Sequence, residues 1–371
     1  MSDVGHSPEP SQPNSQRRYE NDDTLSETED FPLLGSMDAH IQLQPDPQPT
    51  SVPTVTPIAA KNEILGMACM ALSALGFSVM SVLVKMAGKA FPSTQIVFSR
   101  SVFQLVCGLL GCSMVGVAPW GPSNVNRWLL VSRGAAGALG LGFYFFTIIN
   151  MPLGDGTTLF FIGPAFTAVA AYLFLNEPYT VMDAAASTCC LVGVVLVSQP
   201  EFLLGSSHRP SDETEKYQYE RYIPALSAIA AAFILSIAYC IIRVVGKRVH
   251  YLVHVTYFGL MSTILSGILL LFSKGVVSVS HWTMEQWFIM FGVGAAAFVA
   301  QCFLNAGLQL ANAGPATLMR NLDIVFAFIF GQVLFHETPD AMSLAGALLI
   351  GLTTAAVAYT KWLYSQQTQN E

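Results

Sequence analysis

The sequence predicts an all-α membrane protein with about ten transmembrane helices, arranged as two inverted five-helix repeats behind a disordered N-terminal tail. Only 11% of the 371 residues are charged and 53% are hydrophobic, whereas a soluble domain averages about 25% charged residues. From Glu63 onward, long apolar runs alternate with short polar breaks. Landmark residues of the first half recur in the second half at a nearly constant offset. These three observations indicate a duplicated membrane bundle.

The apolar runs are each long enough to cross the roughly 30 Å hydrocarbon core of a bilayer as a helix. Prolines interrupt the chain between them, as in Glu177-Pro178 and Thr338-Pro339, which is typical of helix boundaries. The predicted spans are 64–84, 95–117, 127–149, 156–175, 180–198, 223–243, 252–272, 285–309, 315–335 and 341–360.

A polar segment, 201–221, divides these spans into five and five, and gives a first repeat at 62–200 and a second at 222–363. An odd number of helices in each copy places the second copy upside down relative to the first, which is the plan of many secondary transporters. The matching landmarks are Gly154 with Gly314, Thr157 with Thr317, Glu177 with Glu337, Lys85 with Arg243, and Trp128 with Trp287.

The N-terminal segment 1–60 is rich in Pro, Ser, Gln, Asp and Glu and has few large apolar residues, so we expect it to be disordered. Within it, Glu29 precedes Leu33 and Leu34 in a pattern that resembles an acidic dileucine signal for cytosolic sorting adaptors. The alternative is a chance match in an acidic tail. Because the segment lacks the pattern of a secretory signal, we expect both termini in the cytosol, at an endomembrane or the plasma membrane.

A resemblance to a known family rests on the ends of the repeats. Each copy has a glutamate after its fourth helix and a glycine in its fifth, Glu177 then Gly193 and Glu337 then Gly346. This resembles the EamA repeats of the drug/metabolite transporter superfamily. The stretches FSRSVFQ, SRGAAG, GPAFTAVAAYLFLNEPYTVMDA, PEFLLGSS and LMRNLDIVFAFIFGQ are similar to the G subgroup of solute carrier family 35. The resemblance covers 62–363 and implies a ten-helix carrier of a small polar metabolite.

Ionisable side chains inside the spans are the first candidates for a binding site, because each costs roughly 2.5–3.5 kcal/mol at mid-membrane. Arg320 and Asp323 lie three residues apart in the ninth span and therefore share a helix face. One interpretation is an internal ion pair that fixes the helix. The other is that Arg320 contacts an anionic substrate while Asp323 sets its charge or takes up a coupling proton, and the two interpretations are compatible.

Two more arginines lie within the spans. Arg133 is followed three turns later by Tyr144, so the two share one stripe of the third span and are candidate pore-lining residues. Small residues recur every four positions there, at Gly134, Ala138 and Gly142, which predicts close helix packing. Arg100, near the start of the second span, either contacts substrate or extends to the membrane interface, and we favour the interface.

Amides and helix-end charges complete the candidates. Gln301, Asn305 and Gln309 recur every four residues in the eighth span and should face the protein interior, as interhelical hydrogen bonds or as substrate contacts. Glu177 lies at a helix end, where a carboxylate caps free N–H groups. Arg243 ends a span, and we expect it to anchor at the interface.

The prediction is therefore a carrier in the lipid bilayer that moves a small polar, anionic organic metabolite. Three intramembrane arginines, Arg100, Arg133 and Arg320, against the single acid Asp323 favour an anion. The alternative is a non-transporting membrane regulator acting through the acidic tail. The sequence has no catalytic, metal-site or phosphate-loop motif and no basic arm, so we expect no enzyme activity, cofactor or nucleic-acid partner. Its oligomeric state stays open.

Overall fold

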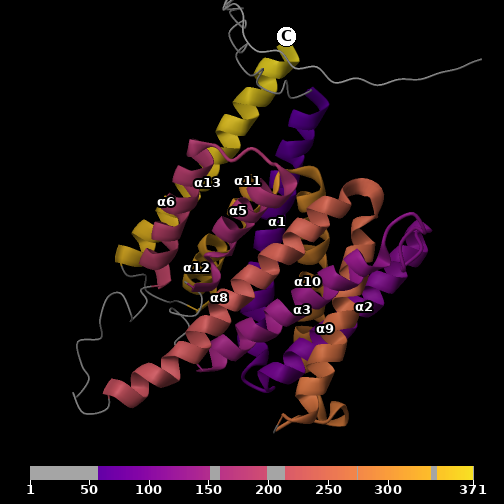
Figure 1. Cartoon of the computed structure of the whole chain (residues 1–371). Helices are drawn as coiled ribbons and strands as arrows, with labels where there is room; N and C mark the ends of the chain where they lie inside the picture. The colour runs from indigo at the N-terminus through magenta and orange to yellow at the C-terminus, as the bar shows by residue number, and fades with distance from the viewer. Residues whose placement is uncertain (1–56, 151–158, 199–213, 274, 336–340, 371) are drawn as a thin grey trace, which may run out of the picture. The chain divides into compact units, whose positions relative to one another are not determined.

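A computed structural model describes residues 57–150, 159–198, 214–273, 275–335 and 341–370 (Figure 1). Three of the expectations above concern residues outside these ranges: the N-terminal tail up to residue 56, the dileucine pattern at Glu29, Leu33 and Leu34, and most of the connecting segment. Glu337, the second repeat's counterpart of Glu177, also lies outside them.

The described residues are helical, as predicted. Nine segments are long and apolar enough to cross a membrane, and a shorter apolar helix joins them. The elements are α1 (Pro57–Ala87), α2 (Ser93–Val115), α3 (Arg127–Asn150), α5 (Gly163–Leu175), α6 (Val181–Ser198), α8 (Thr214–Val245), α9 (Tyr251–Leu271), α10 (Met284–Leu310), α11 (Ala313–Leu318), α12 (Leu322–Phe335) and α13 (Ala341–Asn370), with short 3₁₀ turns η1 (Gly246–Arg248), η2 (Val279–His281) and η3 (Met319–Asn321).

The fourth and ninth spans are interrupted, where an unbroken helix was predicted. The ninth divides into α11, η3 and α12, and the fourth has a turn just before α5, which begins at Gly163. Both breaks fall at corresponding places, because α12 begins at Leu322 and Asp323 is the counterpart of Gly163. Pro164 fits the first turn of α5, where no N–H donor is required. Apolar periodicity alone cannot reveal such breaks, which in membrane carriers are found near binding sites.

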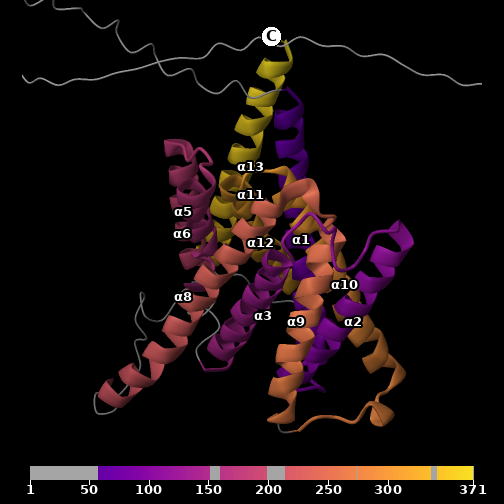
Figure 2. The ribbon, with the colours of Figure 1, turned by 45° about the vertical axis from the view of Figure 1, so that its right-hand side comes forward.

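The helix contacts follow an approximate two-fold pattern that relates the two repeats. The first two helices of the first repeat, α1 and α2, both pack on α10 of the second repeat. Their counterparts in the second repeat, α8 and α9, both pack on α3, which is the counterpart of α10. The pairs α2 with α9 and α6 with α13 are their own counterparts (Figures 1 and 2). The inverted arrangement is thus visible in which helices touch.

One part of the pattern is asymmetric. Helix α13 packs along both α1 and α12. Among the described residues, the counterpart helix α6 has no comparable packing with α8 or α5. The second repeat's last helix is therefore closed against its neighbours, whereas the first repeat's last helix stands further from them.

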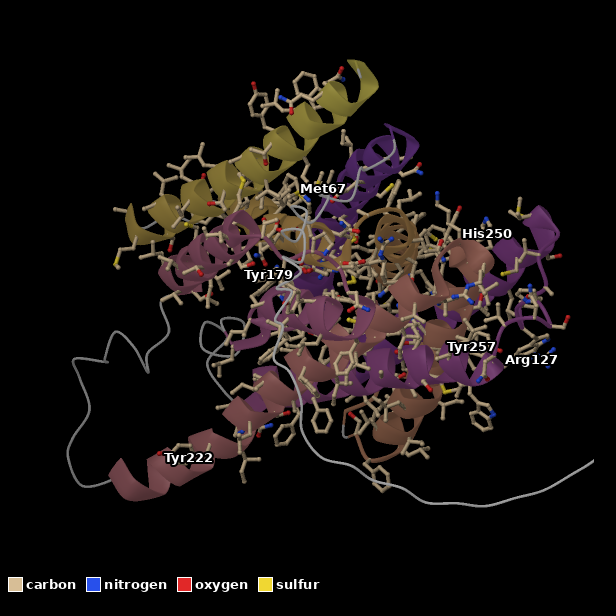
Figure 3. The ribbon with its side chains drawn as sticks, turned by 45° about the horizontal axis from the view of Figure 1, so that its top comes forward. Met67, Arg127, Tyr179, Tyr222, His250 and Tyr257 are labelled. Atoms are coloured by element: carbon tan, nitrogen blue, oxygen red, sulfur yellow. The ribbon has the colours of Figure 1, made fainter. Side chains whose placement is uncertain are left out.

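Close helix crossings occur at Gly134, where the small-residue stripe predicted one, and also at Gly346. A Cβ atom on Gly134 would lie 2.7 Å from the carbonyl oxygen of Tyr257, and a Cβ on Gly346 would lie 2.6 Å from that of Gly193. Because glycine has no Cβ, α3 can pack against α9, and α6 against α13, in direct backbone contact. Figure 3 labels Tyr257 on α9 and Arg127 at the start of α3, beside this first crossing.

Candidate functional site

Arg320 lies in the break of the ninth span. The 3₁₀ turn η3 directs its guanidinium over the ring of Phe77 on α1, with 4.3 Å between the guanidinium carbon and the ring centroid. The same guanidinium is 3.8 Å from the carboxyl group of Asp323, which is the long end of an ion pair. The predicted pairing within the ninth span is thus present but loose, and the aromatic face supplies the closer contact.

Asp323 is held mainly by a serine of the other repeat. The hydroxyl oxygen of Ser78 on α1 lies 2.6 Å from Oδ1 of Asp323 and 2.7 Å from its backbone carbonyl oxygen. The counterpart contact is present in the other half, where the Ser236 hydroxyl donates to the carbonyl oxygen of Gly163 at 3.0 Å. Ser236 follows Ser78 by 158 residues, and Asp323 follows Gly163 by 160. Both repeats thus use the same serine-to-carbonyl link, but one alone adds a carboxyl group.

A pocket opens beside Arg320 between the two repeats. Its walls come from α5 and the turn before it, from the middle of α8, and from α11 with η3. The lining residues are Phe160, Phe161, Gly163, Pro164, Ala232, Leu235, Ser236, Tyr239, Thr317 and Arg320. Arg320 is the only formally charged side chain among them, so the pocket combines apolar and aromatic walls with one cation.

Arg100 and Tyr144 lie near Arg320. Arg100 is only 5% exposed, so the expectation that it extends to the membrane interface is wrong. It lies within electrostatic range of Arg320, and its Nε has no hydrogen-bond partner. Tyr144 is within range of both Arg320 and Asp323, and its ring centroid is 4.1 Å from that of Phe160. Burial is possible because the arginine faces other helices rather than lipid.

Arg133 occupies a second buried polar group between α3, α9 and α10. Its guanidinium donates to Oδ1 of Asn305 at 3.3 Å and lies 5.1 Å from the ring centroid of Phe258. The amide of Asn305 donates to the backbone carbonyl of Gln301 at 2.6 Å. Arg133 makes no ion pair with a described residue, and its Nε has no hydrogen-bond partner. The inward orientation predicted for the amide stripe is therefore confirmed.

Tyr144 and Arg133 were expected along one stripe, and they do share helix α3. The structure nevertheless assigns them to different surroundings: Tyr144 lies with Arg320 and Asp323, and Arg133 with Asn305. Tyr239 of α8 connects the two groups, since it lines the pocket of Arg320 and is within electrostatic range of Arg133.

Four neighbours of these groups were not identified from the sequence. Phe77 and Ser78 contact the charged pair, Tyr239 connects the two groups, and His254 is fully buried within electrostatic range of Arg133. The repeat offset could have revealed Ser78, because a serine recurs at Ser236. Nothing in the sequence pattern distinguishes Phe77 or Tyr239 from other core aromatics.

A separate polar cluster joins the repeats at the end of the bundle where α1 begins and α13 ends. Arg243 of α8, which was expected to anchor at the membrane interface, forms an ion pair with Glu177 at this end of the bundle. The second carboxylate oxygen of Glu177 accepts the backbone N–H of Ala313 at 2.7 Å. Glu177 thus caps a helix, as predicted, but the helix is α11 of the other repeat.

The cluster continues across this end through Asn312. Its side-chain oxygen accepts a hydrogen bond from Arg243 at 2.8 Å, and its amide reaches Glu63 of α1 at 3.5 Å. Glu63 in turn pairs with Lys361 of α13 at 3.2 Å. We call Glu63, Glu177, Arg243, Asn312 and Lys361 the terminal clasp, because together they connect α1, α8 and α13 with the end of α5 and the start of α11, at the end that carries both termini of the bundle.

Comparison with known proteins identifies the family. The model of the EamA-like transporter family matches residues 64–199 and 223–359. The chain belongs to the EamA-like transporter family. This EamA protein is therefore an integral, multi-pass membrane transporter of a small molecule rather than an enzyme. Within its described residues, no group of His, Cys, Asp or Glu side chains could hold a metal ion.

Individual relatives agree with this assignment. Human solute carrier family 35 member G1 is 29% identical over 304 residues, which cover 82% of this EamA chain and 81% of the human protein. The pseudopaline exporter CntI of Pseudomonas aeruginosa is 30% identical over 296 residues, with 80% and 96% coverage. The S-adenosylmethionine uptake transporter of Rickettsia conorii is 22% identical, with 82% and 95% coverage. The resemblance to the G subgroup is thereby confirmed.

A solved crystal structure supports the fold independently. It matches this EamA chain with a TM-score of 0.64 at 18% sequence identity, and covers 78% of this chain and 95% of its own. At that level of identity the match supports the helical arrangement and carries no information about the substrate.

Proposed function

We propose that this transporter is a secondary carrier that moves a small polar organic anion by alternating access between its two repeats. The observation that carries the proposal is the charge balance of the buried interior. Arg100, Arg133 and Arg320 face the inside of the bundle, and Asp323 is the one acid beside them among the described residues.

An unmatched guanidinium inside a membrane protein is costly unless a partner neutralises it. Arg100 and Arg133 are both less than one tenth exposed, and each has an Nε donor without a partner. A carboxylate or phosphate group is the natural complement of such donors, because it accepts the planar pattern of N–H bonds that a guanidinium presents. A bound anion would satisfy in one step both the charge and the free donors.

The proposed substrate site combines both polar groups. Arg320, Asp323, Arg100 and Tyr144 form its first part, with the pocket beside Arg320 as the entry. A second part follows beyond Tyr239, and consists of Arg133, Asn305 and Gln301. Relatives named for the export of pseudopaline and the uptake of S-adenosylmethionine support a small organic molecule as substrate.

Alternating access is supported by the asymmetry between the two ends. The terminal clasp and the packing of α13 on α1 close one end, while α6 stands apart from α8 and α5. In inverted-repeat carriers the opposite state forms when the two repeats exchange conformations around a fixed site. With both termini in the cytosol, which we also propose, the closed end is cytosolic and the described state faces the other side.

The proposal is tested by transport into proteoliposomes. Purified full-length protein is reconstituted, and uptake is measured for a panel of labelled organic anions, cations and neutral polar solutes. We expect uptake of one or more anions, strongly reduced by Arg133→Gln and unchanged by Arg248→Gln, which removes an exposed arginine of the same chain. Uptake restricted to cations would overturn the anion assignment.

A further inference from the structure

Ser78 has one hydrogen for two short contacts with Asp323. A serine hydroxyl carries a single hydrogen, yet its oxygen lies 2.6 Å from Oδ1 and 2.7 Å from the backbone oxygen of Asp323. A backbone carbonyl can only accept. Either Ser78 shares its hydrogen between the two oxygens, or it donates to the carbonyl and the carboxyl group supplies the hydrogen of the Oδ1 contact.

The other repeat shows the same serine without the carboxyl group. Ser236 has two carbonyl oxygens around it, those of Ala232 at 2.8 Å and Gly163 at 3.0 Å, and shares one hydrogen between them. Both contacts of Ser78 are shorter than either of these. The difference between the repeats is thus the carboxyl group of Asp323, which accepts a hydrogen bond from Ser78 when ionised and can donate one to it when protonated.

Few charged or titratable groups of the described part face the carboxyl group of Asp323. Arg320, one turn earlier, is 3.8 Å away and faces the Phe77 ring. Tyr144 of α3 is within electrostatic range of Asp323. On the helices packed against α12, the remaining charges of the described part lie toward the ends of α1 and α13, where Glu63 pairs with Lys361 and Lys85 lies in the last turn of α1. Arg100 of α2 is within electrostatic range of Arg320.

We infer that Asp323 is a proton-binding site and that the proton travels together with the anionic substrate. In the ionised state, the Asp323 carboxylate attracts Arg320 and competes with the substrate for it. Protonation forms one O–H bond on Asp323, turns that hydrogen to Ser78, and leaves the Arg320 guanidinium free for an anion. A monoanion and one proton then cross together without net charge. This inference rests on the proposed transport of an anion.

Infrared difference spectroscopy of the purified protein tests the proton without any substrate. The wild-type protein should show, at neutral pH, the C=O stretching band of a protonated carboxylic acid, which Asp323→Asn removes. Ser78→Ala should shift this band, because it removes the hydrogen-bond acceptor, and Ser236→Ala should leave it in place. Absence of the band in the wild type, or its persistence in Asp323→Asn, overturns the inference.

Asp183 provides the matched control. It is as buried as the site residues, but it accepts hydrogen bonds from both the backbone N–H and the hydroxyl of Thr180, as an ionised carboxylate does. Asp183→Asn should therefore leave the band unchanged. Loss of the band in this variant would reassign the proton and contradict the inference.

A second measurement tests the coupling. In the proteoliposomes described above, uptake of the anion that the screen identifies should rise severalfold when the outside is made more acidic than the inside. In Asp323→Asn, the ratio of uptake with this pH gradient to uptake without it should fall to one. A wild-type ratio of one would overturn the coupling even when the infrared band is present. If the screen finds cations alone, the anion proposal fails while the infrared result still decides whether Asp323 holds a proton.

Discussion

Helix α5 with the turn before it, and the α11–η3–α12 segment, are the same element in two copies, and they differ in charge. Both are broken at the same place, and both are tied at the break by a serine from the first helix of the opposite repeat. Phe160 stands where the second copy has Arg320, and Gly163 where it has Asp323. The backbone plan is therefore the shared scaffold, and the charged site is an addition to one copy.

The terminal clasp extends the comparison to the ends of the bundle. At the end of the first copy's fourth helix, Glu177 binds Arg243 and caps α11 of the other copy. Removing Glu177 should have the largest effect on stability, because it leaves a half-buried guanidinium and a helix N-terminus without their anion. Glu177→Gln should lower the free energy of unfolding by about 3 kcal/mol, measured by denaturant titration in detergent micelles.

An exposed glutamate provides the control for this substitution. Glu285, in the first turn of α10, is exposed, and Glu285→Gln should change the free energy of unfolding by less than about 0.5 kcal/mol. If the two substitutions changed the free energy of unfolding equally, Glu177 in the terminal clasp would stabilise the protein no more than an exposed glutamate does.

Two glycines, Gly346 and Gly163, differ in how closely a neighbouring helix approaches their backbone. A Cβ on Gly346 would lie 2.6 Å from the backbone oxygen of Gly193, whereas a Cβ on Gly163 would meet nothing closer than 3.8 Å. Gly346→Ala should therefore cost about 2 kcal/mol by overpacking, and Gly163→Ala less than about 0.5 kcal/mol. Thermal unfolding of the two purified variants side by side measures the difference, and a larger loss in Gly163→Ala would contradict the described packing.

The two serines sharpen the comparison of the copies. Ser78→Ala and Ser236→Ala each remove the link between the repeats, and each should cost about 1 kcal/mol of stability. Their effects on transport should differ, because only Ser78 contacts a carboxyl group. We expect the pH dependence of uptake to shift in Ser78→Ala and to stay as in the wild type in Ser236→Ala. An identical shift in both variants would assign the pH effect to the scaffold.

The smallest effect is expected from the N-terminal tail. Deletion of residues 1–56 leaves α1 complete from Pro57, so uptake into proteoliposomes should be unchanged within error. Loss of uptake on deletion would favour a role of the tail in transport, and this experiment also separates a carrier from a regulator that acts through its tail.

Much of this fold was predictable because membrane spans need long apolar runs and duplication leaves a constant offset. The nine long helices found among the described residues, and the inverted plan, follow from these two signals. The breaks at Gly163 and at Arg320 were not predicted, since each span as a whole is long and apolar enough to be a single helix. Arg100 was misplaced for a related reason: its distance from the helix start suggests an interface, but its burial depends on which helices cover it.

The charged residues of the candidate site could be predicted from the sequence, but the contacts that they make could not. Arg320, Asp323, Arg133 and the amides of α10 stand out, because polar groups are rare in apolar spans. Which of them meet depends on packing between helices far apart in the sequence, so the separation of Tyr144 from Arg133 is visible only in three dimensions. The same holds for the cap that Glu177 provides to α11.

The central claim is that the charge present in one copy alone carries the transported anion. It is tested most directly by uptake of the identified anion by Arg320→Gln, beside Arg320→Lys and wild type, with correct folding verified by thermal unfolding. We predict that Arg320→Gln lowers uptake at least tenfold, and that Arg320→Lys, which keeps the charge but loses the planar fork, recovers part of it. Wild-type uptake by a folded Arg320→Gln protein would contradict the account.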